Sequence, residues 1–231
     1  MTATIRFVFA LTLALVPLQS ALGNDRLLMA GGEVSETDFY SYLGVMLPGP
    51  GYENGRGFFQ RYWLDRFGYE YEGAAGEVDA KAWGGEAAVG YVIPTRNGWW
   101  SASVGLRFTD TELSPDDRSA SARGKQFSPK VQLEGDTEIA PKWRLGAIGS
   151  YTIEQSQYWG RIRLLRRMSS EWSFGAEAIA NGNDEMDSIA AGTVLIWQPD
   201  SQRWSLAFKA GYRFQDGYNG TFGGLEIGHP F

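Results

Sequence analysis

The alternation of apolar residues with polar or small ones, repeated along most of the chain, is the feature that most restricts its fold. Between Trp204 and Phe214 the even positions hold Trp, Leu, Phe, Ala, Tyr and Phe, whereas the odd positions hold Ser, Ala, Lys, Gly and Arg. Trp100 to Phe108 repeats this pattern. From Phe127 to Ile139 one face again carries charged or amide side chains without interruption from residue 130 onward. A period of two residues predicts β-strands whose two faces meet different surroundings.

Both ends of the chain predict export to the outer membrane. Residues 1–23 combine Arg6, an apolar run from Phe7 to Leu18 and small residues before Asn24, as a cleaved secretory signal does. The run is too short to cross a bilayer as a helix. The closing segment, Thr221 to Phe231, alternates and stops on an aromatic residue, an ending typical of outer-membrane barrels. We therefore expect a signal peptide over 1–23 and one barrel domain over 24–231.

Aromatic residues gather at the ends of the alternating segments, which favours lipid over water around the barrel. In a soluble sandwich or a lipocalin-like barrel the apolar face would turn inward and the aromatics would concentrate at mid-strand. Rings at strand ends match the aromatic girdles at the two headgroup levels of a membrane barrel. The residues assigned to these girdles are Trp99, Trp100, Trp143, Tyr151, Tyr158, Trp159, Trp172, Trp197, Trp204 and Tyr212. The predicted fold class is all-β, a single antiparallel transmembrane β-barrel.

Turn chemistry sets the number of strands and their direction. Pro, Gly, Asn, Asp and Ser cluster at 94–98, 140–141, 169–170, 182–185, 199–202 and 216–220, and the longest gap runs from Thr111 to Gly124. If the C-terminus is periplasmic, as we expect, this long loop is extracellular. The same count leaves the strand at 38–48 descending, so it requires an ascending strand before it, for which only Arg26 to Glu33 is available. We expect about 12 strands, with 10 as the alternative.

Charged residues on the polar faces are expected to line the lumen. Because an isolated buried charge is costly, these side chains should pair across the lumen or contact water. They could form a hydrophilic conduit or a saccharide-binding lumen, or an ionic plug that satisfies itself inside a narrow barrel. The candidate lumen-lining residues are Arg107, Lys130, Glu134, Asp136, Glu138, Arg144, Arg161, Arg163, Glu177, Lys209, Arg213 and Glu226.

The segment from Gly57 to Tyr71 does not fit the simple division into two faces. Arg61 and Asp65 have the same parity as Phe59, Trp63, Phe67, Tyr69 and Tyr71. Either this strand contains a β-bulge or part of it rises above the bilayer.

The sequence gives little support for catalysis or for a cofactor. The single histidine, His229, lies near the C-terminal rim on the predicted lipid-facing side, and no serine neighbours it in sequence as a nucleophile. Glu134 and Asp136 share one strand face about 7 Å apart, a spacing that could serve glycoside hydrolysis but that also suits lumen lining. No catalytic, cofactor-binding or metal-binding residues are predicted, and the absence of cysteine excludes thiolate sites. A formal net charge of −6 argues against nucleic acid as a partner.

The order of short motifs along the chain resembles the BcsS family of cellulose biosynthesis proteins. The motifs are Tyr40-Ser-Tyr-Leu-Gly44, Gly57-Phe-Phe-Gln-Arg61 leading to Tyr69-Glu-Tyr71, Leu113-Ser-Pro115, Gly175-Ala-Glu177 with Gly182-Asn-Asp184, and the glycine-rich closing strand. The family is alphaproteobacterial and accompanies cellulose synthase operons, so the resemblance implies an outer-membrane accessory to cellulose production or secretion. It brings no established catalytic or ligand residues.

Three functional hypotheses follow. The first is a non-enzymatic outer-membrane barrel that assists cellulose or another exopolysaccharide across or onto the outer membrane. Outer-membrane lipid is then one partner, and the resemblance adds cellulose or components of the cellulose synthase machinery. The second is a small porin-like diffusion channel, and the third is a lipid- or glycan-modifying barrel enzyme.

Overall fold

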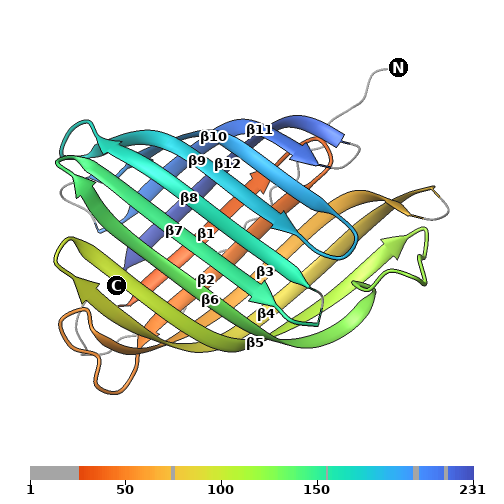
Figure 1. The fold of residues 1–231 in the computed structure, drawn as a ribbon, viewed down its shortest axis with the longest axis horizontal. Coiled ribbons are helices and arrows are strands. Elements are labelled where there is room, and N and C mark those ends of the chain that lie inside the picture. The colour runs from red at the N-terminus through yellow and green to blue at the C-terminus, as the bar shows by residue number, and fades with distance from the viewer. Residues whose placement is uncertain (1–25, 74–75, 155, 200–202, 216–217) are drawn as a thin grey trace.

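The chain folds into a closed barrel of twelve antiparallel strands (Figure 1). The computed structural model describes residues 26–231 except 74–75, 155, 200–202 and 216–217, and the predicted signal over 1–23 lies outside the described residues. The strands are β1 (Leu27–Val34), β2 (Phe39–Pro48), β3 (Gly57–Gly73), β4 (Gly76–Thr95), β5 (Gly98–Ser114), β6 (Gly124–Ala140), β7 (Trp143–Thr152), β8 (Gln157–Arg167), β9 (Trp172–Gly182), β10 (Asp187–Trp197), β11 (Ser205–Gln215) and β12 (Tyr218–Pro230).

Pairing between the first and last strands closes the barrel and confirms the predicted count of twelve. Each strand pairs antiparallel with its neighbours in sequence, and β1 pairs with β12 from Leu27 opposite Pro230 to Val34 opposite Gly223. The strand required by the turn count at Arg26 to Glu33 is therefore present as β1. Over the height that all the described strands share, closure gives every strand a hydrogen-bonded neighbour on both sides, as lipid requires of a β-structure.

The wall of the barrel is taller on one side than on the other. We call the rim that carries Phe231 the near rim and the opposite one the far rim. Strands β3 to β6 have 17 to 20 residues, whereas the other strands have 8 to 13. Because β2 pairs with β3 only as far as Gly68, and β7 pairs with β6 only from Lys130, the extra residues lie mainly at the far rim. The β3–β4 and β5–β6 hairpins project there (Figure 1).

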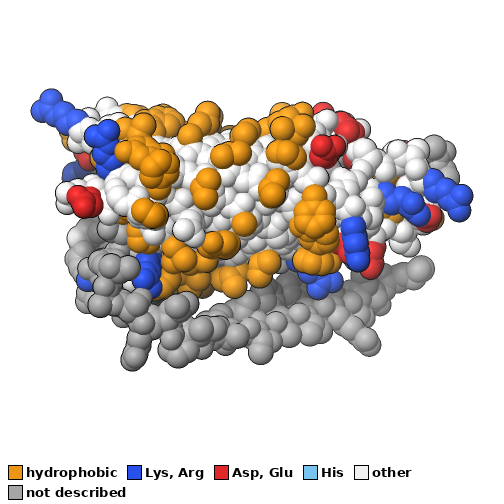
Figure 2. Space-filling view, turned by 90° about the horizontal axis from the view of Figure 1, so that it is seen from below, with side chains coloured by type: hydrophobic (Ala, Val, Ile, Leu, Met, Phe, Trp, Pro, Cys, Tyr) orange, Lys and Arg blue, Asp and Glu red, His pale blue; other side chains and the backbone are white. Residues whose placement is uncertain are grey.

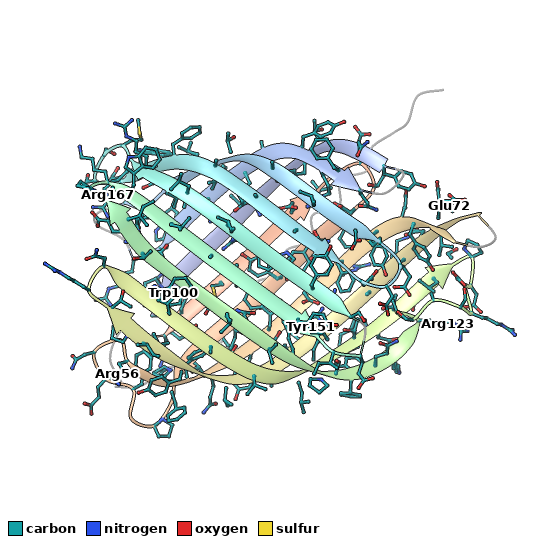
Figure 3. The ribbon with its side chains drawn as sticks, in the orientation of Figure 1. Arg56, Glu72, Trp100, Arg123, Tyr151 and Arg167 are labelled. Carbon is teal, nitrogen blue, oxygen red and sulfur yellow. The ribbon has the colours of Figure 1, made fainter. Side chains whose placement is uncertain are left out.

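The outer surface of the barrel is apolar between its two ends. Large hydrophobic side chains such as Phe127, Leu133 and Leu106 are exposed by 72%, 65% and 63%. Figure 2 shows hydrophobic side chains over the middle of the visible face and charged ones gathered at its ends. Arg56 and Arg167 mark one end in Figure 3, and Glu72 and Arg123 mark the other. In the part of the chain that the structure describes, no helix is long and apolar enough to cross a membrane.

The structure explains the unusual parity of β3 in a way that the sequence did not suggest. Residues 57–73 of β3 pair with β4 without any shift of register, so of the two alternatives the β-bulge is wrong. Phe59, Arg61, Asp65 and Tyr69 are all buried, because this whole face of β3 points into the lumen. Inward-facing aromatics therefore share the lumen with the charges, and the strand keeps a simple alternation.

Three smaller expectations also change. Trp159, assigned to a lipid girdle, lines the lumen and packs against the buried cluster of Ile179, Ala190 and Phe222. Trp99 shares the inward parity of Ser101 and Arg107 and lines the lumen close to the near rim. The long loop spans only residues 115–123, because Thr111 to Ser114 still belong to β5 and Thr111 pairs with Gly124.

Candidate functional site: the lumen

The lumen of the barrel is the candidate functional site. It encloses a cavity of about 520 Å³ that runs from Leu27, Met46 and Trp99 close to the near rim to Tyr69 and Met186 toward the far rim. Nine of the twelve residues predicted to line the lumen border this cavity, namely Arg107, Lys130, Glu134, Asp136, Arg161, Arg163, Lys209, Arg213 and Glu226. Glu177 and Arg144 lie behind them as ion-pair partners. Glu138 is exposed at the near rim, next to a register shift between Glu138 and Ala140, so the prediction that it lines the lumen is wrong.

A first ionic cluster covers the wall formed by β3 to β6. The guanidinium of Arg107 donates two hydrogen bonds to the Asp65 carboxylate, at 2.8 and 3.0 Å. Glu86 accepts from Arg61 and from Lys130, both at 2.6 Å. The side chains of Asp65 and Glu86 are 2% and 1% exposed, so these carboxylates have exchanged water for cationic donors. Arg61, Asp65 and Glu86 were not among the predicted lining residues.

A second ionic cluster connects β8, β9, β11, β12 and β1. Glu226 of β12 accepts from Arg161 at 2.9 Å, from Arg163 at 3.1 Å and from Lys209 at 3.1 Å. Arg163 also donates to Glu177, and Lys209 lies 2.8 Å from Glu33. Since β8 and β12 are four positions apart around the barrel, the bonds from Arg161 and Arg163 to Glu226 are chords across the lumen. The cluster ends toward the far rim, where Arg213 joins Glu33 to Asp38 in the β1–β2 turn.

A third, smaller group lies toward the near rim on β5, β6 and β7. Asp136 accepts from Arg144. Glu134 accepts from the hydroxyl of Ser101 at 3.2 Å and from the amide of Gln132 at 3.1 Å. Among the described residues, no lysine or arginine nitrogen lies within 4.0 Å of the Glu134 carboxylate. Glu134 is thus held by neutral donors, unlike the other carboxylates of the lumen.

The charges of the three groups balance. Eight side chains are cationic, namely Arg61, Arg107, Lys130, Arg144, Arg161, Arg163, Lys209 and Arg213. Eight are anionic, namely Glu33, Asp38, Asp65, Glu86, Glu134, Asp136, Glu177 and Glu226. The lumen therefore carries no formal excess of either sign, and it offers no single-sign field to concentrate a charged solute.

An aromatic stripe separates the two larger clusters, and sequence reasoning missed it. Tyr40 and Tyr42 on β2 and Trp63 on β3 point into the lumen beside the cavity. The Tyr42 and Trp63 rings are stacked with centroids 4.5 Å apart, and the Trp63 indole N–H donates to the Tyr40 hydroxyl at 3.1 Å. The signal that could have revealed the stripe was parity, because Trp63 alternates in phase with Arg61 and Asp65.

Loops cross the mouth of the barrel at the far rim. The amide of Asn183 in the β9–β10 turn donates to the Tyr69 hydroxyl on β3 at 3.1 Å. Strands β3 and β9 are six positions apart in a ring of twelve, so this bond joins opposite sides of the barrel. The backbone N–H groups of Ser121 and Ala122 in loop 115–123 donate to Glu185 of the same turn. Beneath them, a buried cluster of Tyr69, Tyr71, Val78, Ala80 and Met186 fills the far end of the lumen.

The geometry does not favour catalysis by Glu134 and Asp136 or by His229. Asp136 forms an ion pair with Arg144, so it is engaged there and is poorly placed to act together with Glu134 in acid–base hydrolysis. His229 lies in β12 with the parity of Ile227, opposite to the inward-facing Glu226, and so points away from the lumen at the near rim. In the part of the chain that the structure describes, no group of three or more histidine or acidic residues is placed to hold a metal ion.

Comparison with solved structures places the chain among outer-membrane β-barrels by fold. The KdgM porin in complex with disordered oligogalacturonate superposes with a TM-score of 0.51 and 11% identity, covering 89% of this chain and 99% of that one. An outer-membrane channel from Pseudomonas putida F1 gives a TM-score of 0.55 and 12% identity, covering 91% and 97%. The translocator domain of the autotransporter NalP from Neisseria meningitidis gives 0.52 and 11%, covering 91% and 90%. At these identities the likeness concerns the fold alone.

Comparison of the sequence identifies the family. No curated protein matches the chain significantly. The family model described as cellulose biosynthesis protein BcsS, however, matches residues 27–231, which are the barrel from the start of β1 to the last residue. The chain therefore belongs to the BcsS family of cellulose biosynthesis proteins.

Proposed function

We propose that this protein is a non-enzymatic barrel of the bacterial outer membrane that assists cellulose secretion while keeping its own lumen closed to the polymer. The family supports the link to cellulose, and the fold with its apolar outer belt supports the location. In this proposal the near rim faces the periplasm and the far rim, with its tall hairpins, faces the exterior. The surplus length of β3 to β6, which places the tall hairpins and the 115–123 loop at the far rim, agrees with this orientation.

The chords across the lumen carry the proposal that the barrel is not the conduit. For a chain of sugars to pass, Glu226 would have to part from Arg161 and Arg163, and Tyr69 from Asn183. Separation of the ion pairs would leave charges in the lumen without their counterions, which is costly. The chords to Glu226 and the Tyr69–Asn183 bond cross the barrel at two successive levels, so passage would require the lumen to be remodelled at both.

Deletion of the gene in its native host tests the cellulose half of the proposal. Surface cellulose, measured by dye binding and by acid-insoluble glucose, is expected to fall and to recover when the intact gene is returned. Unchanged surface cellulose in the deletion strain would refute it. Membrane fractionation and heat-modifiable gel mobility test the other half, since a folded outer-membrane barrel should fractionate with outer membranes and migrate differently after boiling.

A second candidate function is a small diffusion channel. It is favoured by the cavity of about 520 Å³ and by the similarity in fold to the KdgM porin and to the Pseudomonas putida channel. Single-channel recording in planar bilayers separates the two candidates. A barrel with a closed lumen should show no steady open level, whereas a porin should show one that scales with salt concentration.

A further inference from the structure

Tyr42 and Trp63 of the aromatic stripe form a fixed stack on the lumen wall, in which one ring overlaps the other, and Tyr40 lies tilted beside it. The Tyr42 and Trp63 rings are nearly parallel, with 12° between their planes, and the Tyr40 and Tyr42 centroids lie 5.6 Å apart. The hydrogen bond from the Trp63 indole N–H to the Tyr40 hydroxyl restrains the orientation of the indole. Rings held in this way lose little conformational entropy when a ligand stacks on them.

Two glycines allow the rings to lie against the strands. A Cβ atom added to Gly44 would lie 2.1 Å from the Trp63 ring, and one added to Gly31 would lie 2.7 Å from the Tyr42 ring. Any side chain at these positions would push the rings off the wall and into the cavity. Glycine permits the close approach of ring and backbone. The rings thus line the cavity without filling it.

The surroundings of the stripe favour a neutral ligand rich in hydroxyl groups. The ionic clusters on either side of it are paired internally, so a charged ligand would enter without a free counterion and would carry an uncompensated charge into the lumen. A hydroxyl group needs only an acceptor or a donor that is not fully used. Glu134 accepts only from neutral donors at 3.1 and 3.2 Å and has lone pairs left for another hydroxyl.

We propose that the lumen binds a short, neutral, β-linked glucose oligomer, with the apolar C–H face of a pyranose ring on the outer face of the Tyr42–Trp63 stack. In such a glucan the hydroxyls are equatorial, so each ring presents two apolar faces and a polar edge. The cavity of about 520 Å³ lies within the range of roughly 300–1,000 Å³ that small-molecule sites occupy, which limits the ligand to a few sugar units. Since the far rim is crossed by the Tyr69–Asn183 bond, the ligand enters from the near rim. The choice of a glucan over other neutral saccharides rests on the proposed function in cellulose secretion.

Binding of cellotetraose to the purified full-length barrel in detergent micelles tests this proposal. Calorimetry and quenching of tryptophan fluorescence are expected to show saturable binding that weakens about tenfold or more in Trp63→Ala. Trp100→Ala is the matched control, because Trp100 also lies flat over a glycine, Gly135, but on the outer face, where it is 47% exposed. Trp63→Phe retains a stacking ring and should keep most of the affinity. Heat-modifiable mobility verifies that each variant is folded.

The outcomes separate this proposal from the proposed function. No saturable binding of cellotetraose, or equal losses in Trp63→Ala and Trp100→Ala, would overturn the binding site. Equal affinity for an oligomer of galacturonic acid would overturn the preference for neutral sugars. If Trp63→Ala fails to fold, Tyr42→Ala gives the same test on the neighbouring ring. A deletion strain with normal cellulose, alongside clear binding in vitro, would leave the site standing and remove the cellular role.

Discussion

Replacing Arg107 by methionine should destabilise the barrel far more than the loss of one exposed charge. Arg107 supplies both of the hydrogen bonds that Asp65 accepts, at 2.8 and 3.0 Å, and the Asp65 side chain is only 2% exposed. Methionine fills a similar length but leaves that carboxylate buried without a donor. Breaking a buried pair from one side costs about 3–5 kcal/mol. The guanidinium also lies 5.9 Å from the centre of the Phe67 ring, a contact that adds about 0.5–1 kcal/mol.

Guanidinium-induced unfolding of the barrel in lipid vesicles, followed by tryptophan fluorescence, measures this cost. The matched control is Lys81→Met, which breaks the Lys81–Asp79 pair on the same wall, where the two side chains are 54% and 42% exposed. This substitution should cost at most about 1 kcal/mol. In the double variant Asp65→Leu with Arg107→Met, both charges are gone, so much of the stability should return.

The comparison also reports on the state of the lumen. If Arg107→Met costs no more than Lys81→Met, water must reach Asp65 freely and replace the lost donors. The description of the lumen as closed would then be wrong, and with it the reason for excluding passage of the polymer.

Three further predictions concern the far rim and the wall. A spin label attached to Arg118→Cys reports on the 115–123 loop without interference, because the chain has no other cysteine. The label should become more mobile in Glu185→Ala, which removes the acceptor of two backbone amides of the loop, but not in the control Asp184→Ala, at an exposed neighbouring residue. Equal mobility in both variants would refute a role for Glu185. Hydrogen bonds from the Ser119 hydroxyl and backbone amide hold the pKa of Asp117 below its usual range. The ionised Asp117 carboxylate therefore stabilises the loop above about pH 4, and this stabilisation is lost as the pH falls below that value. The mobility of the same spin label should therefore increase in acid, and Asp117→Asn should remove this pH dependence. The same pH dependence in Asp117→Asn as in the parent protein would contradict the role of Asp117. Gly175→Ala should prevent heat-modifiable folding, because the new Cβ would lie 1.9 Å from the Leu164 carbonyl oxygen, whereas Gly149→Ala, with no atom within 4 Å, should fold normally.

Alternation along the chain was sufficient to predict the barrel, because a period of two assigns each residue to a face wherever one face is apolar. Strand β11 shows this most clearly, with Phe208 and Phe214 exposed and Arg213 buried as expected. Counting turns from the last strand also required β1, whose sequence Leu27–Val34 alternates only weakly. The assignment of strand-end aromatics to lipid was wrong at Trp159, which has the parity of the inward-facing Arg161, and the association of aromatic residues with the lipid face also misled along β3. The lumen contains aromatic rings as well as charges, so an aromatic residue does not by itself indicate the lipid face.

The partners of the lumen charges could not be predicted in the same way. Parity shows that Arg161 and Glu226 point inward, but not that they meet, since they are 65 residues apart and belong to strands that do not pair. Their contact depends on barrel closure and on the diameter of the lumen. The platform of Tyr42 and Trp63 was hidden for a related reason. It depends on the register that sets Trp63 opposite Gly44 and Tyr42 opposite Gly31.

Because its strands differ in length, the barrel has a tall side and a low side. At about 3.3 Å per residue, the 20 residues of β4 measure roughly 66 Å along the strand, about twice the length of the 10 residues of β2. Roughly 9–11 residues suffice for a tilted strand to cross a bilayer. The surplus in β3 to β6 rises above the far rim on one side of the barrel only. A barrel of uniform height presents the same profile to neighbours on all sides in the plane of the membrane. This barrel does not, so a protein that assembles beside it contacts either the tall side formed by β3 to β6 or the low side.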